Sequence, residues 1–331
     1  MSNNKKNKRF SLFNFNKDGK GVKKEEADLP LTFLNFFKIF PRHFSKILSV
    51  NIAMVLGNFP IFFILPVLAG YFHNTSISPA DIRYPIIGGI LPFLEDKIPL
   101  TPLLSTVGMF ETISAWTVMD YVILGLSALA IFTFGPVCAG TTYIIRNLLK
   151  GEPVFMWDDM KYSIKRNLLQ SIIYGISDIA LTAMLVYDIY FFYIRAGLSF
   201  ANSMFFYVSL VSFVIYMFMR YYVYLMMVTF DLSLFKLFKN AMIFSFLGFK
   251  RNIMAMLGIT LVAALNVLIF SFAPLMALGI ALPLVATTAI CTYIAAYAAW
   301  PKIKQIMIDP YYKDEDVSYD GPTEPIMRDV L

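Results

Sequence analysis

Long apolar stretches that almost lack charged residues are the main feature of this chain. The first begins at Ile47 and continues to Ala80, and its only acidic or basic residue is His73. A helix of about 20 apolar residues is long enough to cross a lipid bilayer. The stretches predict six spans, at residues 47–71, 121–145, 168–193, 202–230, 252–273 and 279–300. We therefore expect an all-α fold, a polytopic membrane protein with a six-helix transmembrane bundle.

Two polar tails flank the predicted membrane domain and differ in charge. The chain divides into a basic segment at 1–30, a membrane domain at 31–301 and an acidic segment at 302–331. Charged segments with few apolar residues do not bury enough surface to fold. Residues 1–28 and 308–331 within these tails are therefore expected to be disordered.

Lys and Arg residues are unevenly distributed between the links that join the spans. They are frequent at 146–166 and at 231–251, whereas the long loop at 72–120 holds only Arg83 and Lys97. Cytoplasmic loops of membrane proteins carry an excess of Lys and Arg. We therefore expect both termini and the two basic links in the cytoplasm, and the loop at 72–120 on the outer side.

Composition supports a membrane protein and narrows its chemistry. Hydrophobic residues make up 58% of the chain, and the mean hydropathy is +0.65. The net charge of +6 is concentrated at the expected inner face, which favours contact with anionic lipid and argues against nucleic acid as a partner. Cys138 and Cys291 both lie in predicted spans, so neither a disulfide framework nor a metal site is expected.

Each basic link contains a segment with one apolar face. The apolar positions at helical spacing are Trp157, Met160 and Ile164 in the first link, and Phe235, Phe238 and Met242 in the second. This spacing predicts cytoplasmic amphipathic connecting helices. They serve either as connectors lying on the lipid or as a docking surface for a partner. Both links end in Lys-Arg-Asn, at 165–167 and 250–252, which is consistent with a degenerate repeat.

Two opposite charges interrupt the third and fourth spans. Asp178 and Arg220 each lie about 16 Å from the cytoplasmic end of their helix, at 1.5 Å per residue. An unpaired charge at this depth is costly, so we expect the two side chains to approach each other. The pair either locks the two helices together or lines a path for a solute or proton. In a third interpretation, Arg220 begins an interfacial stretch and reaches outward.

The loop at 72–120 is too apolar for an ordinary solvated loop and too often interrupted by Pro and Gly to span the bilayer. Residues 101–116 predict an amphipathic helix on the outer membrane surface. The loop then acts as packing material, as a lid over the bundle, or as a contact for an external binding protein.

Several motif positions resemble those of a known family. They are Asn51, Pro60, Gly135, Pro136, Ala139, Gly151, Glu152, Trp157, Phe230, Asp231, Lys239, Asn240 and Ala241. Over most of residues 46–300 the chain resembles the YesL-like family of small bacterial membrane proteins. It differs in the long stretch between the proline of the first span and the Gly-Pro segment of the second.

This resemblance implies a place in the bacterial cell membrane and a role near sugar uptake. The family has no established biochemical activity, but its members are often encoded beside carbohydrate ABC importers. The resemblance implies nothing finer than this context. Together with the two amphipathic segments it leads to the hypothesis of a non-catalytic accessory or regulatory protein of a carbohydrate import system, which docks through those segments on importer permease subunits. The alternative is a small-solute permease that uses Asp178 and Arg220.

No catalytic constellation is apparent in the sequence. His43 and His73 fall on opposite sides of the membrane in this topology, so a Ser-His-Asp or metal site is not readily assembled. We therefore expect no enzyme activity and no cofactor.

Overall fold

The computed structural model describes residues 29–79 and 110–310. The helices are α2 (Phe33–Gly57), α3 (Ile64–Leu68), α6 (Val118–Ser127), α7 (Ala130–Lys150), α8 (Met156–Arg195), α9 (Phe200–Met227), α10 (Leu234–Leu247), α11 (Phe249–Ser271), α12 (Met276–Leu282) and α13 (Thr288–Ile303). The strands are β1 (Asn74–Pro79) and β2 (Phe110–Ala115). Residues 1–28 and 311–331 of the two predicted tails lie outside the described residues, whereas the start of the second tail is helical through Ile308.

The described helices are long and apolar enough for a multi-pass membrane protein. Five candidate spans are Val118–Lys150, Met156–Leu198, Phe200–Met227, Phe249–Ser271 and Ala273–Ile308. A sixth forms if Phe33–Gly57 and Phe59–Leu68, which meet at a bend of 59°, count as one broken span. The predicted all-α membrane fold is therefore confirmed.

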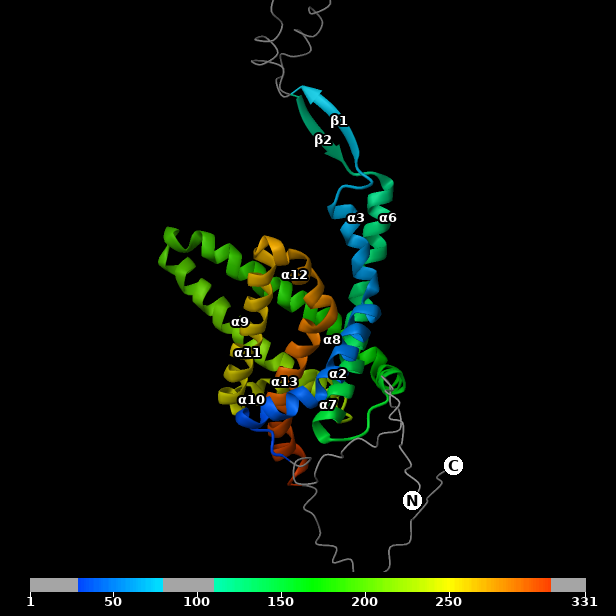
Figure 1. Ribbon diagram of the computed structural model, residues 1–331. Coiled ribbons are helices and arrows are strands. Elements are labelled where there is room, and N and C mark those ends of the chain that lie inside the picture. Colours follow the sequence, from blue (N-terminus) through cyan, green and yellow to red (C-terminus); the bar gives the residue numbers. More distant parts are fainter. Residues whose placement is uncertain (1–28, 80–109, 311–331) are drawn as a thin grey trace, which may run out of the picture.

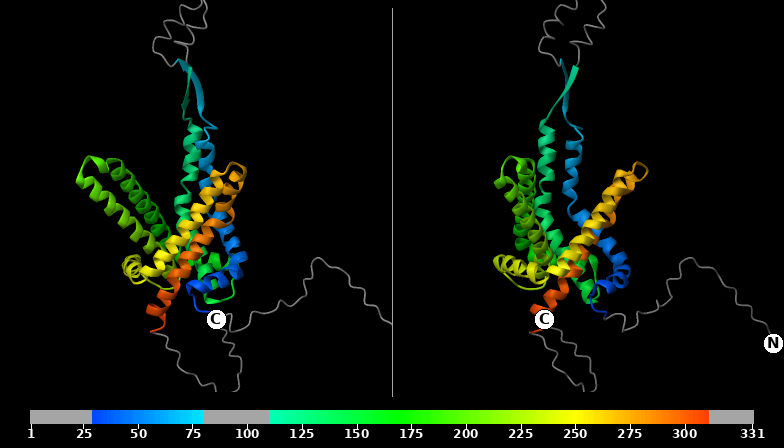
Figure 2. Two further views of the ribbon diagram at one scale, coloured as in Figure 1. Left: turned by 60° about the vertical axis from the view of Figure 1, so that its left-hand side comes forward. Right: turned by 90° about the vertical axis from the view of Figure 1, so that its left-hand side faces the viewer.

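The spans separate into groups toward one end of the molecule and meet at the other (Figures 1 and 2). The α8–α9 hairpin leans away from the pair formed by α11 and α12–α13. On the other side α3 and α6 run together and end in the β1–β2 ribbon. The buried core lies where the groups converge, and it includes Ile47, Ile144, Tyr222 and Tyr293.

A two-stranded ribbon replaces part of the helix predicted for 101–116. β1 pairs with β2 in antiparallel register, from Asn74 opposite Ala115 to Pro79 opposite Phe110. The helix prediction is wrong at 110–115, and residues 101–109 lie outside the described residues. The reason is local, because both strands contain β-branched Thr and Ile, which favour extended backbone.

The first amphipathic link and the third span form one bent helix. α7 ends at Lys150 and is capped by Gly151, whose φ of 73° is a left-handed conformation that glycine adopts readily. α8 then runs from Met156 to Arg195 and is interrupted only at Asn167, where φ is −114° and ψ is 17°. The amphipathic segment therefore meets the membrane segment at a kink.

The two Lys-Arg-Asn tripeptides occupy similar places in the fold. Asn167 lies at the kink of α8, and its side-chain amide donates to the carbonyl of Ser163 at 3.1 Å. Asn252 lies in the first turn of α11, after the break at Gly248, and donates to the carbonyl of Ser245 at 3.0 Å. Each buried Asn thus bonds the amphipathic segment that precedes its span, which agrees with a repeat.

Asn51 explains how the last span tolerates a proline. Its Nδ2 donates to the carbonyl of Pro283 at 3.0 Å, and its Oδ1 accepts from the backbone N–H of Ala289 at 2.8 Å. The intervening Pro283–Thr287 segment is a π-helical turn. Backbone groups freed by such a turn need hydrogen-bond partners within the protein, because lipid offers none. Asn51 supplies them and so joins α2 to the last span.

Glycines allow α7 and α8 to touch through their backbones. A Cβ atom added to Gly135 would lie 1.9 Å from the carbonyl oxygen of Ser171, and one added to Gly175 would lie 2.6 Å from the Cα of Gly135. Small residues permit such close helix contact in membranes. The Gly-Pro motif of the second span therefore has a packing role.

Gly135→Ala is expected to destabilise the protein by about 1–3 kcal/mol, the usual cost of overpacking. The midpoint of thermal unfolding of the detergent-solubilised protein, followed by size-exclusion chromatography, measures the change. The control is Gly125→Ala in α6, because no described atom lies within 4 Å of its added Cβ. An equal loss in both variants would contradict the close contact.

Candidate functional site

Asp178 on α8 and Arg220 on α9 form a bidentate ion pair. Nε of Arg220 lies 2.8 Å from Oδ1 of Asp178, and its Nη2 donates to Oδ2 at 2.9 Å. Paired bonds of this kind are among the stronger polar contacts in proteins. The prediction that the two charges approach each other is confirmed. The interfacial interpretation of Arg220 is wrong, because its guanidinium is directed to Asp178.

Tyrosines complete the surroundings of the pair. The hydroxyl of Tyr216 donates to Oδ1 of Asp178 at 2.7 Å. The Asp178 side chain is fully buried, whereas the Arg220 side chain is 30% exposed. The hydroxyls of Tyr174 and Tyr224 are buried without a hydrogen-bond partner among the described residues. Both carboxylate oxygens are thus bonded, and the pair is neutral as a whole.

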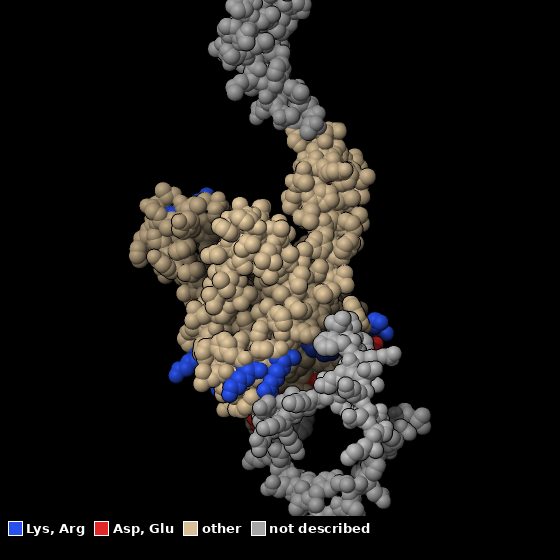
Figure 3. Space-filling view, in the orientation of Figure 1, with Lys and Arg blue, Asp and Glu red and all other residues tan. Residues whose placement is uncertain are grey.

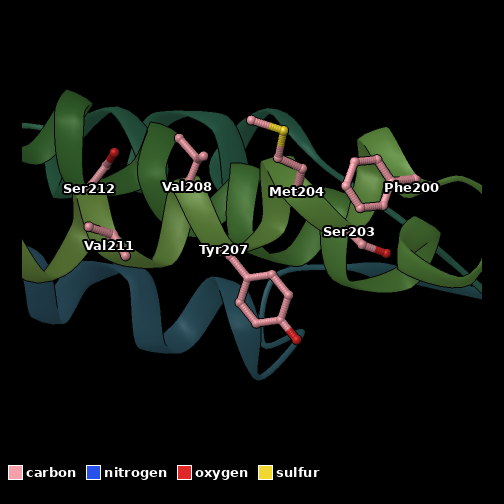
Figure 4. Close-up of a pocket in the computed structure, with 7 residues that line it drawn as sticks. All are labelled: Phe200, Ser203, Met204, Tyr207, Val208, Val211 and Ser212. Carbon is pink, nitrogen blue, oxygen red and sulfur yellow. The ribbon is translucent and has the colours of Figure 1, made fainter.

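An open groove of about 480 Å³ lies elsewhere on α9 (Figure 4). Its lining residues are Phe200, Ser203, Met204, Tyr207, Val208, Val211 and Ser212. Neither Asp178 nor Arg220 is among them. The groove therefore does not lead the charge pair to the surface.

The first predicted docking face is divided by the fold. Met160 is buried, and Ile164 is partly buried against α7, where both side chains lie close to Gly140. Trp157 is 54% exposed. Met160 and Ile164 are therefore not available to a partner, since they hold the amphipathic segment of α8 against α7. Trp157 remains accessible.

The second predicted face is also shared between core and surface. Phe235 is 79% exposed and Met242 is 44% exposed. Phe238 packs its ring against Tyr174, with centroids 5.5 Å apart. α10 is held to the bundle by Leu237, Ala241 and Phe244, which are buried. Phe235 and Met242 are accessible, and Phe238 is a packing residue.

The exposed aromatic residues of the two predicted docking faces, Trp157 and Phe235, belong to segments at the Lys- and Arg-rich end of the molecule. Most Lys and Arg side chains in view gather along the lower edge in Figure 3, below the spans. α10 and the start of α8 lie at the same end (Figure 1). The motif residues Asp231 and Lys239 are exposed there, and Asn240 is half-buried. Ser233 occupies the N-cap position of α10, without a side-chain capping bond.

Arg146 has a structural role that the sequence does not reveal. Its Nη1 donates to the carbonyl of Val228, just after α9, at 2.6 Å. Its Nε and Nη2 donate to Oδ1 of Asn147 at 3.2 and 2.9 Å. A cation at a helix C-terminus is favourable. The sequence places Arg146 at the start of the basic link at 146–166, and the structure shows that it is buried and joins α7 to the end of α9.

A Ser-His-Asp arrangement is present at the opposite end, contrary to expectation. Nδ1 of His73 lies 2.7 Å from Oγ of Ser114, and Nε2 of His73 lies 3.6 Å from Oδ1 of Asp120. His43 is not involved, since its ring contacts Tyr293. Pairing of β1 with β2 brings Ser114 to His73, and this pairing was not predicted. The signal readable in advance was the capping box of Thr117 and Asp120.

Replacing one partner of the ion pair is expected to lower the free energy of unfolding more than replacing both partners together. Asp178→Asn or Arg220→Met leaves one buried polar group without its partner, which typically costs about 3–5 kcal/mol. The double variant should recover much of the lost stability. Thermal unfolding of all four proteins in detergent gives the coupling between the two positions. Additive losses would contradict a direct pairing.

Comparison with known proteins finds a family similarity for part of the chain. The model of a family described as "Protein of unknown function, DUF624" matches residues 114–189. No curated protein and no solved structure matches the chain. The matched segment includes β2 residues, α6, α7 and most of α8, and with them Gly135, Gly151 and Trp157. This chain is therefore similar, over that segment, to a family whose function is unknown.

Proposed function

We propose that the chain is a YesL-like accessory or regulatory membrane protein of a bacterial carbohydrate ABC importer, and that its part in import is docking rather than catalysis. The observation that carries the proposal is the exposure of Trp157 and Phe235 at the Lys- and Arg-rich end. The match at residues 114–189 supports the family assignment and contains Trp157.

The two aromatic residues suit a protein contact. Large aromatic side chains are enriched at protein interfaces, where they contribute much of the binding energy. Each is presented by a segment whose other face is fixed: Met160 holds the start of α8, and Leu237 holds α10. A preorganised surface loses little conformational entropy on binding. Importer permease subunits are the partners that the resemblance implies.

The orientation forms part of the proposal. Lys and Arg gather at the end that carries α10 and the start of α8 (Figure 3). By the positive-inside tendency this end faces the cytoplasm, together with both termini. The β1–β2 ribbon is then on the outer side of the cell membrane. Docking through Trp157 and Phe235 takes place at the inner surface.

The competing function is a small-solute permease that works through Asp178 and Arg220. In its favour, the hydroxyls of Tyr174 and Thr182, one turn on either side of Asp178, lack partners among the described residues. Against it, both oxygens of Asp178 are bonded and its side chain is sealed from solvent. A residue in a solute path needs access to a cavity. We therefore favour a structural lock.

Pull-down of the tagged protein from its native membrane in mild detergent tests the proposal. Importer permease subunits should co-purify with the wild-type chain. The Trp157→Ala, Phe235→Ala double variant should retain about tenfold less of them, since loss of an exposed aromatic anchor typically costs 1 kcal/mol or more. The Asp178→Asn, Arg220→Met variant should retain them if it remains folded.

Tyr190→Ala provides the matched control, because Tyr190 is 63% exposed but belongs to the other end of α8. It should not change the recovery of partners. The docking proposal fails if the wild-type protein is recovered alone. It also fails if the Trp157→Ala, Phe235→Ala double variant and the Tyr190→Ala control retain the same amount of partner. Solute flux into liposomes that depends on Asp178 and Arg220 would then support the permease.

A further inference from the structure

The Ser114–His73–Asp120 cluster lies where the β1–β2 ribbon joins α3 and α6. His73 follows α3 and immediately precedes β1, Ser114 belongs to β2, and Asp120 lies in the first turn of α6. The ribbon and the ends of these helices project beyond the rest of the bundle (Figures 1 and 2). The three residues come from separate elements and meet at one point.

Asp120 is held in a fixed orientation. Its Oδ2 accepts from the backbone N–H of Thr117 at 2.8 Å and from the Thr117 hydroxyl at 3.0 Å. The Thr117 side chain in turn accepts from the backbone N–H of Asp120. Asp120 is fully buried, and its Oδ1, which has no hydrogen-bond partner among the described residues, lies 3.6 Å from Nε2 of His73. One carboxylate oxygen is thus used for folding and the other faces the imidazole.

His73 is placed between an acid and an alcohol. With the proton on Nε2, this nitrogen faces Oδ1 of Asp120 across 3.6 Å, a charge contact longer than a hydrogen bond, and Nδ1 is left to accept from the Ser114 hydroxyl. The ring is further held by Trp116, which stacks on it at 5.9 Å between centroids. A hydroxyl bonded to a base that a third group orients is the pattern of an activated nucleophile.

We propose that Ser114 is a nucleophile for acyl transfer, with His73 as its general base and Asp120 as the residue that positions and charge-balances His73. The roles of the two ring nitrogens are exchanged relative to the most familiar triads, but the chemistry needs only one acceptor and one donor. The 3.6 Å contact between Nε2 and Oδ1 gains attraction when His73 takes up the proton.

The surroundings favour an amphiphilic carboxylic ester as substrate. Ser114 is exposed and can be reached from outside the protein. The neighbouring surface is strongly apolar: Tyr71 is 80% exposed, Tyr121 is 62% exposed and Trp116 is 48% exposed. Such a surface at the end of membrane helices suits an acyl chain next to a polar ester group.

The reaction balances without a cofactor. Oγ of Ser114 attacks the ester carbonyl carbon while its proton passes to Nδ1 of His73. The tetrahedral intermediate collapses, the bond to the alcohol oxygen breaks, and the proton on Nδ1 goes to that oxygen. Water then attacks the acyl-serine with the same base, which releases the carboxylic acid and restores the Ser114 hydroxyl.

A fluorophosphonate with a long alkyl chain tests the nucleophile directly in the full-length protein in detergent. Such a probe becomes attached to an activated serine as fluoride leaves. Peptide mass analysis of the wild-type protein should place the adduct on Ser114. Ser114→Ala should remove it, and Ser45→Ala, which changes an exposed serine of α2, should leave it unchanged.

Hydrolysis of 4-nitrophenyl octanoate tests the roles of the other two residues. His73→Gln should lower the rate by about 100-fold, within the usual range for loss of a general base. Asp120→Asn should lower kcat with little change in KM when kcat is expressed per folded protein recovered from size-exclusion chromatography, so that loss of folded protein does not account for the change. The octanoyl ester should be hydrolysed faster than 4-nitrophenyl acetate if the apolar surface binds the acyl chain.

Wild-type protein that takes no label on Ser114, or hydrolysis that persists in Ser114→Ala, would overturn the proposal. The wild-type labelling result does not depend on the folding of any variant. The activity is independent of the importer role, because it uses residues at the other end of the molecule. Failure of one proposal therefore leaves the other intact.

Discussion

Polar groups inside a membrane must find their partners within the protein, and this constraint organises the described bundle. The Asp178–Arg220 pair joins α8 to α9. Asn51 joins α2 to the last span at its π-helical turn, and the hydroxyl of Tyr222 on α9 donates to Asn252 on α11 at 2.8 Å. Each bond connects two different helices. Together they link the groups of spans at the place where the groups converge.

Close backbone packing complements these polar links. Gly135 and Gly175 bring α7 and α8 into contact, and Arg146 fixes the end of α9 against α7. Beyond this core the helices diverge and present apolar side chains outward, as expected for surfaces covered by lipid. The described helices therefore pack most closely where the groups of spans converge, toward the Lys- and Arg-rich end. The exposed Trp157 and Phe235 are presented from that half.

Sequence patterns predicted the features that depend on hydrophobicity and local chain geometry. The spans follow from long apolar stretches, and the Asp178–Arg220 contact follows from the cost of unpaired charges in lipid. They did not show which side of an amphipathic segment packs inward. α10 is apolar on most sides, so spacing alone did not separate Phe238, which packs on Tyr174, from Phe235, which is exposed.

Two contacts between positions far apart in the chain could not be predicted from the sequence. Ser114 reaches His73 only because β1 pairs with β2 across a long intervening segment, and helical periodicity at 101–116 concealed that pairing. Arg146 was counted only as one of the basic residues in the link at 146–166, and its buried partner, the carbonyl of Val228, lies 82 positions further along the chain. Both cases need three-dimensional proximity that no local pattern contains.

Docking through exposed aromatic residues at the Lys- and Arg-rich end requires Trp157 to touch a partner protein. A photo-reactive phenylalanine analogue placed at position 157, and separately at position 190, tests this contact in living cells. We expect a protein adduct from position 157 that contains an importer permease subunit, and none from position 190. The absence of any protein adduct at position 157, with the variant present at wild-type level, would rule out the contact.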